Sequence, residues 1–151
     1  MTTTTATPMI FVNLPVTDLE RSVAFYEAVG ATRNQFTDGA TASGVSFSDA
    51  IHVMLLTHKK FSEFTTRAIA GRDTAQTLLC LSCASRAAVD AAVASAVAAG
   101  GVADPGPVQE HGFMYGRSFE DPDGHIWEVA WMDPAAMSSA APAAEPAAVT
   151  A

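Results

Sequence analysis

The stretch EDPDGHIWEVAWM, residues 120–132, contains a turn that leads directly into a strand. Pro122 presets its own φ, and Gly124 accepts the positive φ that many tight turns require. The residues on either side, 113–119 and 125–132, are rich in the aromatic and β-branched side chains typical of strands. The stretch therefore predicts a β-hairpin.

A carboxylate lies in the middle of the second of these strands. Alternation places Trp127 and Val129 on one face and Glu128 on the other, between the apolar residues Ile126 and Ala130. Burying an ionised carboxylate without a partner is costly, so such a residue usually has a metal, a cation or a proton beside it. The alternative is a Glu128 that lies on a solvated outer face.

Composition limits the classes of partner. The chain has 151 residues and a formal net charge of −8, which fits one domain and makes nucleic acid and anionic membranes poor partners. The start of the chain lacks the features of a signal peptide, and no apolar run reaches the length of a membrane span. We therefore expect a cytoplasmic protein that binds neither nucleic acid nor membranes.

The two halves of the chain repeat one order of elements. Residues 9–16 read as a strand, and Thr17 with Glu20 forms a capping box for a helix that stops at Gly30. In the second half a strand over 77–83 precedes a helix that begins after Ser85 and stops at Gly100. The shorter strands are predicted near 32–36, 42–47, 51–57 and 102–108, so the chain reads as an α+β protein with an internal duplication.

Three segments fall outside the two halves. Residues 58–76 have no clean period and are long for a loop, so we interpret them as a lid or as a segment packed on a partner subunit. Residues 1–8 and 134–151 are predicted to be disordered tails, the second of them rich in Ala and Pro.

Cys80 and Cys83 have the C-x-x-C spacing of some redox and zinc sites. They lie in an apolar run that reads as a strand, where positions three apart point to opposite faces. A redox pair prefers a helix N-terminus, and a zinc site needs a second pair of ligands. The spacing therefore favours buried structural thiols.

Two motifs resemble those of a known superfamily. The segment FVNLPVTDLERSVAFY, residues 11–26, and the segment EDPDGHIWE, residues 120–128, are similar to the opening and closing motifs of the vicinal oxygen chelate superfamily. This superfamily includes glyoxalase I, bleomycin-resistance proteins and extradiol dioxygenases. Within it, the chain is most similar to bacterial proteins described as predicted lactoylglutathione lyases.

The resemblance implies a single domain over residues 9–133 with two βαβββ modules. The modules span about 9–57 and 77–133, and their curved mixed sheets enclose a pocket. By position, the metal ligands of the superfamily correspond here to Phe11, Leu55, Leu78 and Glu128. Only Glu128 can bind a metal, whereas a divalent site needs three or more donor side chains. We therefore expect no cofactor, and a divalent metal remains the less favoured alternative.

The histidines offer few substitutes as metal ligands. His52 lies an odd number of positions from Leu55 and so faces the opposite way along the strand, unless a bulge intervenes. His58 and His111 lie at loop edges, and His125 lies at the turn exit, where solvent is the usual partner.

Other residues are candidates for ligand binding. Asn13 shares a strand face with Phe11 and either orients a ligand or makes a local hydrogen bond. The resemblance places Ser118 on the pocket side. Tyr115 and Arg117 share the opposite face, where Arg117 either pairs with an acid at the sheet edge or is turned inward by a bulge. The predicted ligand-binding residues are Phe11, Asn13, Leu55, Leu78, Tyr115, Arg117 and Ser118.

Three functions remain open. The first is a bleomycin-resistance-like protein that binds a small organic molecule, without the metal of the superfamily and as a homodimer. The second is a lactoylglutathione lyase-like (carbon-sulfur lyase) or isomerase activity, with Glu128 as general base or metal ligand. The third is a structural or interaction module in which Glu128 is an ordinary strand residue with its polar group satisfied.

Overall fold

The computed structural model describes residues 6–139, and its first half is one sheet covered by one helix. The mixed sheet has the order β1-β4-β3-β2, with β1 and β4 parallel and the other pairs antiparallel. The helix α1 spans Leu19–Ala28. The strands are β1 (Ile10–Val16), β2 (Thr32–Arg33), β3 (Ala42–Ser46) and β4 (Ile51–Thr57).

The second half repeats this arrangement. Its sheet has the order β5-β9-β8-β6, with β5 and β9 parallel, β7 paired to β8, and the helix α3 over Arg86–Ala98. Of the strand predicted over 102–108, only the first two residues are a strand, β6, and a second short strand, β7, follows the predicted range. The strands are β5 (Leu78–Ser82), β6 (Val102–Ala103), β7 (Gln109–Glu110), β8 (Met114–Glu120) and β9 (Ile126–Met132). The predicted α+β fold with two modules is confirmed.

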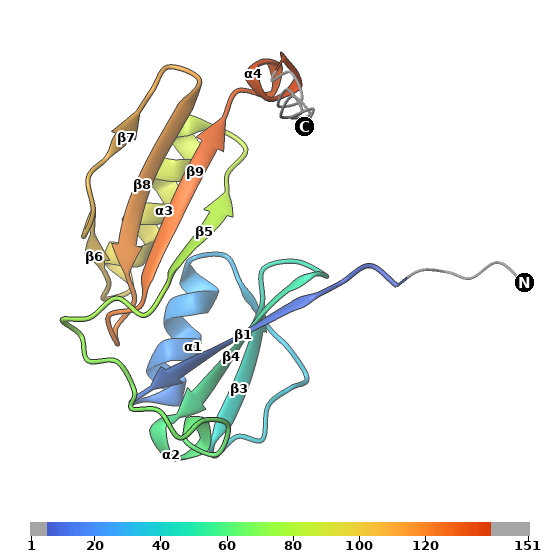
Figure 1. Cartoon of the computed structure of the whole chain (residues 1–151), viewed down its shortest axis with the longest axis vertical. Helices are drawn as coiled ribbons and strands as arrows, with labels where there is room; N and C mark the ends of the chain where they lie inside the picture. Colours follow the sequence, from blue (N-terminus) through green and yellow to red (C-terminus); the bar gives the residue numbers. More distant parts are fainter. Residues whose placement is uncertain (1–5, 140–151) are drawn as a thin grey trace, which may run out of the picture.

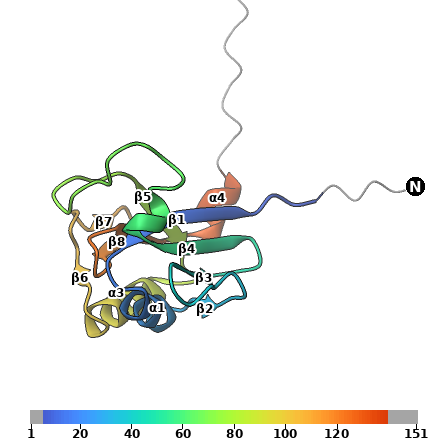
Figure 2. The same ribbon diagram turned by 90° about the horizontal axis from the view of Figure 1, so that it is seen from below.

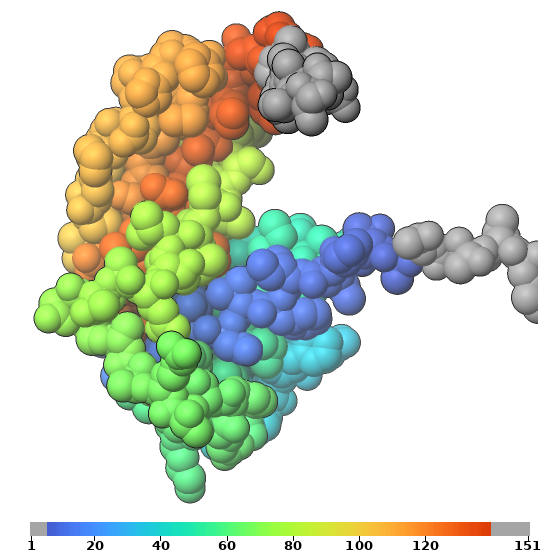
Figure 3. Space-filling model, in the orientation of Figure 1, coloured from blue at the N-terminus to red at the C-terminus, as the bar shows by residue number. Residues whose placement is uncertain are grey.

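The modules meet through their helices, and their sheets diverge. Helices α1 and α3 lie side by side on one side of the sheets, and the linker between the modules crosses the other side (Figures 1 and 2). Strands β1 and β5 each lie at the edge of their own sheet. Figure 3 shows the molecule hollowed between β1 and the second module. The two sheets therefore do not close around a pocket within one chain.

The helix starts show one error in the sequence prediction. The carboxylate of Asp18 caps α1 by accepting a hydrogen bond from the Arg21 amide at 3.0 Å, so the cap lies one residue after the predicted Thr17. The hydroxyl of Thr17 instead donates to Asp123 Oδ1 at 2.7 Å. The predicted Ser85 cap of α3 is confirmed, since its hydroxyl oxygen accepts from the Ala88 amide at 3.0 Å. The capping position of α1 is thus displaced by a bond to the other module.

A buried group of polar side chains joins the modules. The hydroxyl of Tyr26, in α1, donates to Asp121 Oδ2 at 2.6 Å and accepts from Trp127 Nε1 at 3.0 Å. Asp121 Oδ1 also accepts from the amides of Asp123 and His125, both at 2.9 Å. Tyr26 and Asp121 are fully buried, and Trp127 is nearly so. The turn of the closing hairpin is therefore fixed to the helix of the first module.

Aromatic packing surrounds this group. Phe25 contacts Phe119 at 5.9 Å between ring centroids, and Phe47 contacts Trp127 at 5.4 Å, so both contacts cross between the modules. Because aromatic pairs add stability beyond their buried area, this shared core holds the halves in one arrangement.

The linker is tied to the same turn. It begins with the short helix α2 (His58–Phe61), and Arg72 donates to Pro122 O at 3.0 Å and to Glu120 Oε2 at 2.8 Å. A Cβ on Gly124 would lie 2.7 Å from Arg72 Cγ, so the linker packs closely over this glycine. The predicted role of residues 58–76 as a lid or a partner contact stays a prediction.

The C-terminal part of the described chain departs from expectation. A short helix, α4, spans Pro134–Ser139, where the sequence predicts the start of a disordered tail. The predictions for residues 1–5 and 140–151 lie outside the described residues. Among residues 6–139, no helix combines the length and the apolar character that a membrane crossing requires.

The first prediction concerns the buried tyrosine. Tyr26→Phe leaves the Asp121 carboxylate and the Trp127 indole each short of one hydrogen-bond partner, so we expect a loss of about 2–4 kcal/mol in the free energy of unfolding. The control is Tyr115→Phe, which removes a hydroxyl that bonds Asp90 on the surface. We expect this control to cost less than about 1 kcal/mol. Urea unfolding measures both, and equal losses would contradict the account.

The second prediction concerns pH. Burial raises the pKa of Asp121, so the folded state binds this proton more tightly than the unfolded state. The resulting stabilisation is full below the unfolded-state pKa and is lost as pH rises through the folded-state pKa. We therefore expect the free energy of unfolding of the wild type, relative to that of Asp121→Asn, to fall as pH rises from about 3.9, the ordinary aspartate pKa, toward neutrality. A difference that does not change with pH, measured by urea unfolding, would contradict this assignment.

Candidate functional site

Glu128 lies on the face of β9 that points away from the helices. Its neighbours Trp127 and Val129 are 2% and 3% exposed and belong to the core, as the alternation predicts. In the sheet register, Glu128 lies between Cys80 of β5 and Ser118 of β8. Three polar side chains from three strands therefore form a row on one open face.

This row borders a cavity of about 200 Å³. Glu128 is the only acidic residue that lines it, and forms no ion pair with any residue in the described range 6–139. The other lining residues are one cation, Arg117, and nine uncharged residues: Cys80, Gly106, Pro107, Gln109, Met114, Gly116, Ser118, Val129 and Ala130. Its lining therefore contains one carboxylate and one guanidinium, and the two do not form an ion pair with each other.

The charge of Arg117 is neutralised by two aspartates that do not line this cavity. Its guanidinium donates to Asp104 at 3.1 and 2.6 Å and to Asp90 at 3.0 Å, and the hydroxyl of Tyr115 donates to Asp90 at 2.7 Å. These bonds raise the pKa of Arg117 and lower the pKa of both aspartates. Of the two alternatives for Arg117, pairing with acids is the one observed. A contact of Tyr115 or Arg117 with a ligand stays a prediction.

Ser118 lies where the resemblance implied. Its side chain is 5% exposed, and its oxygen accepts a hydrogen bond from the Gly106 amide at 3.2 Å. Because a serine hydroxyl can also donate, Ser118 retains a donor beside Glu128.

Leu55 does not lie on the open face of the first sheet. It is fully buried, and its register partner is Leu14, so both point to the helix-side core. Asn13 pairs with Met54 instead, one position earlier in β4. Carrying over the position of Leu55 from the resemblance is therefore wrong by one residue, which in a strand reverses the face.

Phe11 belongs to an aromatic cluster on this open face. Its ring stacks on His52 at 4.7 Å between centroids and meets Phe36 edge-on at 5.7 Å. His52 Nδ1 also bonds Ser46 Oγ at 2.7 Å, which explains why a histidine is held there. Phe11 and Phe36 are 42% and 43% exposed, so the cluster offers a flat aromatic surface.

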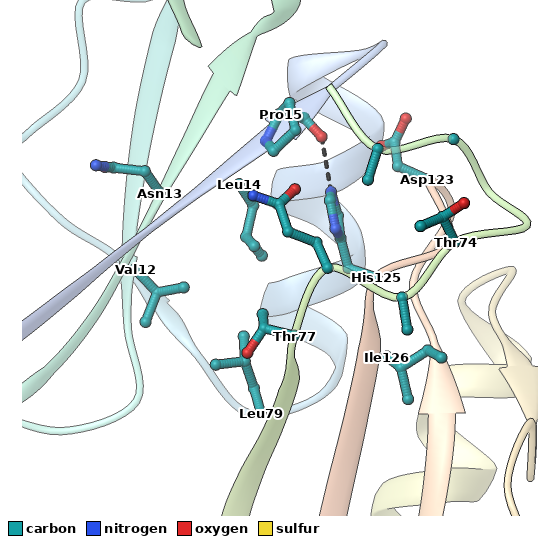
Figure 4. Close-up of a pocket in the computed structure, with 15 residues that line it drawn as sticks. Val12, Asn13, Leu14, Pro15, Thr74, Thr77, Leu79, Asp123, His125 and Ile126 are labelled. Carbon is teal, nitrogen blue, oxygen red and sulfur yellow. Dashed lines mark hydrogen bonds between the residues drawn. The ribbon is translucent and has the colours of Figure 1, made fainter. Parts of the chain in front are cut away.

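Asn13 lies beside a different, smaller hollow at the junction of the modules (Figure 4). This hollow measures about 70 Å³ and lies between β1, the linker and the closing turn. His125 Nε2 donates to Pro15 O at 2.7 Å across it, so His125 binds the first module and is not a turn residue bonded only to solvent. The hollow is small for an organic ligand.

The sequence prediction placed Phe11, Asn13, Leu78 and Glu128 around one pocket. The structure places Glu128 and Leu78 on one sheet face and Phe11 and Asn13 on another. Leu78 is 54% exposed. None of the cavities that Glu128 lines includes a residue of the first sheet. Within one chain, therefore, the two halves of the predicted site are not brought together.

Cys80 is a site residue that sequence reasoning missed. Its side chain is exposed on the face of Glu128, and only Cys83 packs against the core as predicted. The available signal was alternation, because Cys80 lies two positions from Leu78, which was assigned to the pocket. Cys80 also borders a second cleft, of about 500 Å³, between the modules.

The donor set does not fit the metal of the superfamily. Phe11 and Leu78 supply no ligand atom, Leu55 faces the core, and within the described part of the chain no three His, Cys, Asp or Glu side chains are grouped to hold an ion. A site for a divalent metal needs at least three such donors.

Comparisons with known proteins agree with this architecture. Hypothetical protein SA1046 from S. aureus is 25% identical, with a TM-score of 0.69, over 83% of this chain and 94% of that chain. A glyoxalase/bleomycin resistance protein/dioxygenase family enzyme from Burkholderia phytofirmans PsJN is 20% identical, with a TM-score of 0.69, over 83% and 99%. TnmS3, an antibiotic binding protein from Streptomyces sp. CB03234, is 21% identical, with a TM-score of 0.60, over 85% and 98%. No curated protein matches.

The family model of the Glyoxalase/Bleomycin resistance protein/Dioxygenase superfamily matches residues 9–129. This match covers both motifs and both modules. The chain belongs to the Glyoxalase/Bleomycin resistance protein/Dioxygenase superfamily.

Proposed function

We propose that this protein binds a small organic cation at Glu128, in a site that a second copy of the chain completes. The observation that carries the proposal is the Glu128 carboxylate, which lies in a cavity of about 200 Å³ with no ion-pair partner among residues 6–139. A charge in such surroundings gains most from a ligand of opposite charge with an apolar body.

The arrangement of the sheets supports a homodimer. Strands β1 and β5 are both edge strands, and such edges tend to pair with another chain unless they are covered. Large apolar side chains lie exposed along these edges and the adjoining faces: Met9, Ile10, Phe11, Phe36, Leu78, Phe113 and Met132. A second copy that covers them would bring an aromatic cluster of Phe11, His52 and Phe36 toward a Glu128 cavity.

The antibiotic-binding relative TnmS3 is consistent with a binding role, though its likeness extends to the fold alone. The absence of a metal and a cytoplasmic location stay predictions.

A lyase or isomerase remains the alternative proposal. Glu128 would act as the general base, and a donor would have to stabilise the developing oxyanion. Of the candidate side-chain donors, Ser118 borders the Glu128 cavity, whereas Asn13 lies on the other sheet. A single hydroxyl is a weak oxyanion site, so the geometry favours binding over catalysis.

The third prediction tests the charge of the ligand. We expect benzyltrimethylammonium to bind and its anionic counterpart phenylmethanesulfonate not to bind, measured by calorimetry at low salt. Glu128→Gln should weaken binding of the cation about five- to tenfold, because it removes the charge and retains the shape. Glu27→Gln, which removes a charge from an exposed position of α1 on the helix side of the first sheet, is the matched control. Equal affinity for the two probes would contradict the proposal.

The fourth prediction tests the second copy. We expect sedimentation equilibrium to give twice the chain mass of 15.7 kDa for the wild type. Leu78→Lys should dissociate the dimer and weaken binding of benzyltrimethylammonium, because it places a charge on the exposed β5 edge. Val97→Lys, at a 47% exposed apolar position of α3, is the control and should remain dimeric. A wild-type monomer that binds the cation with full affinity would refute the composite site.

A further inference from the structure

Four side chains form a row across the open face of the first sheet, one from each strand. Thr32 is the register partner of Ser46, Ser46 pairs in turn with His52, and His52 pairs with Phe11. The three polar members line a cavity of about 230 Å³ beside the β3–β4 turn, and Ser46 and His52 are each half-buried. The first sheet therefore has a polar row of its own, apart from the row that contains Glu128.

The hydrogen bonds around Ser46 run in one direction. Asn34 Oδ1 accepts from the Phe36 amide at 2.9 Å, so the amide nitrogen of Asn34 donates to Ser46 Oγ at 2.8 Å. His52 Nε2 lies 3.2 Å from Asp49 O, and because a carbonyl can only accept, Nε2 carries a proton. In the neutral ring Nδ1 is therefore the acceptor, and the Ser46 hydroxyl donates to it at 2.7 Å.

This is the arrangement that activates a hydroxyl as a nucleophile. Such a site needs a serine bonded to a base, and a third group that fixes the tautomer of that base. Ser46, His52 and the Asp49 carbonyl fill these three positions. The bond from Asn34 occupies an acceptor site of Ser46 Oγ and so leaves the serine proton directed at the histidine.

Hydrogen-bond donors for an acyl group lie beside Ser46. Asn34 Nδ2 carries a second hydrogen besides the one that it gives to Ser46, and the Thr32 hydroxyl lines the same cavity. In acyl transfer, donors near the nucleophile stabilise the negative charge that develops on the carbonyl oxygen. The row therefore groups a nucleophile, a base and two donors.

The surroundings indicate the kind of substrate. Phe11 stacks on His52, and Phe36 meets Phe11 edge-on, with both phenyl rings more than one-third exposed. An aromatic group of a substrate can pack against these rings while its ester carbonyl lies at Ser46.

We propose that Ser46 and His52 form an acyl-transfer site that hydrolyses small aryl esters, with Ser46 as the nucleophile and His52 as the general base. The group that orients His52 is a backbone carbonyl and not a carboxylate, so the expected substrates are esters with a good leaving group. Every residue involved belongs to the first sheet and its loops, so the inference needs neither Glu128 nor a bound cation.

The reaction balances with water as the second reactant. Ser46 Oγ forms a bond to the carbonyl carbon, its proton passes to His52 Nδ1, and the bond from that carbon to the leaving oxygen breaks. The leaving oxygen takes the proton from His52. Water then attacks the acyl-serine in the same way, which releases the acid and restores the Ser46 hydroxyl, and nothing is oxidised or reduced.

The first test locates the acyl group in the wild-type full-length protein. The protein is mixed with 4-nitrophenyl acetate, quenched with acid during turnover, and mapped by peptide mass spectrometry. We expect acetyl on Ser46 that disappears once the ester is consumed, and this measurement needs no variant. Acetyl found only on other side chains, or a Ser46 acetyl that persists after the ester is consumed, would overturn the proposal.

The second test measures the release of 4-nitrophenolate above the rate without protein. Ser46→Ala and His52→Gln should each lower this rate at least about tenfold, as loss of a nucleophile or its base does. The double variant should be no slower than the slower single variant, because groups that act as one unit lose their effect together. The matched controls, Ser138→Ala on α4 and His111→Gln, alter exposed residues far from this row in the sequence and should keep the wild-type rate.

A rate that Ser46→Ala or His52→Gln leaves unchanged would also overturn the proposal, since surface histidines then account for the hydrolysis. Neither readout involves the calorimetric binding of benzyltrimethylammonium. The esterase site and the proposed cation site can therefore fail independently of each other.

Discussion

The buried carboxylate of Asp121 is the constraint on which the arrangement of the modules depends. It accepts hydrogen bonds from Tyr26 of the first module and from two amides of its own turn, and it has no contact with solvent. Because leaving such a group unsatisfied is costly, the turn cannot move away from α1. Thr17, bonded to Asp123, and Pro15, bonded to His125, hold the same junction from the side of β1.

This junction determines where a site can form. With α1 packed beside α3, the two sheets diverge from the turn at residues 121–124. Strands β1 and β5 each pair with a strand on one side only and lie at the edges of their sheets. The Glu128 cavity and the Phe11 cluster then lie on separate open faces of one chain. The fixed junction therefore leaves two incomplete halves of a site, and a second copy of the chain supplies the missing half in the function that we propose.

The sequence predicted the fold well because its signals were local. The turn at 121–124, the Ser85 cap and the alternation around Glu128 each depend on near neighbours and were confirmed. The errors arose where contacts between residues far apart in the sequence determine the local structure. Thr17 donates a hydrogen bond to Asp123 of the other module, and Asp18 caps the helix. The sheet face on which Leu55 lies is set by its register with β1. Alternation with Leu78 indicates the strand face on which Cys80 lies, but its exposure follows from the divergence of the sheets.

The central claim is that Glu128 is an uncompensated negative charge to which a cationic ligand binds. A crystal structure of the protein with bound benzyltrimethylammonium tests it most directly. The account predicts the quaternary nitrogen within about 4–6 Å of the Glu128 carboxylate, with the Phe11 cluster of a second copy against the aromatic ring. A divalent metal on Glu128, or a basic side chain of the second copy already paired with it, would contradict the account.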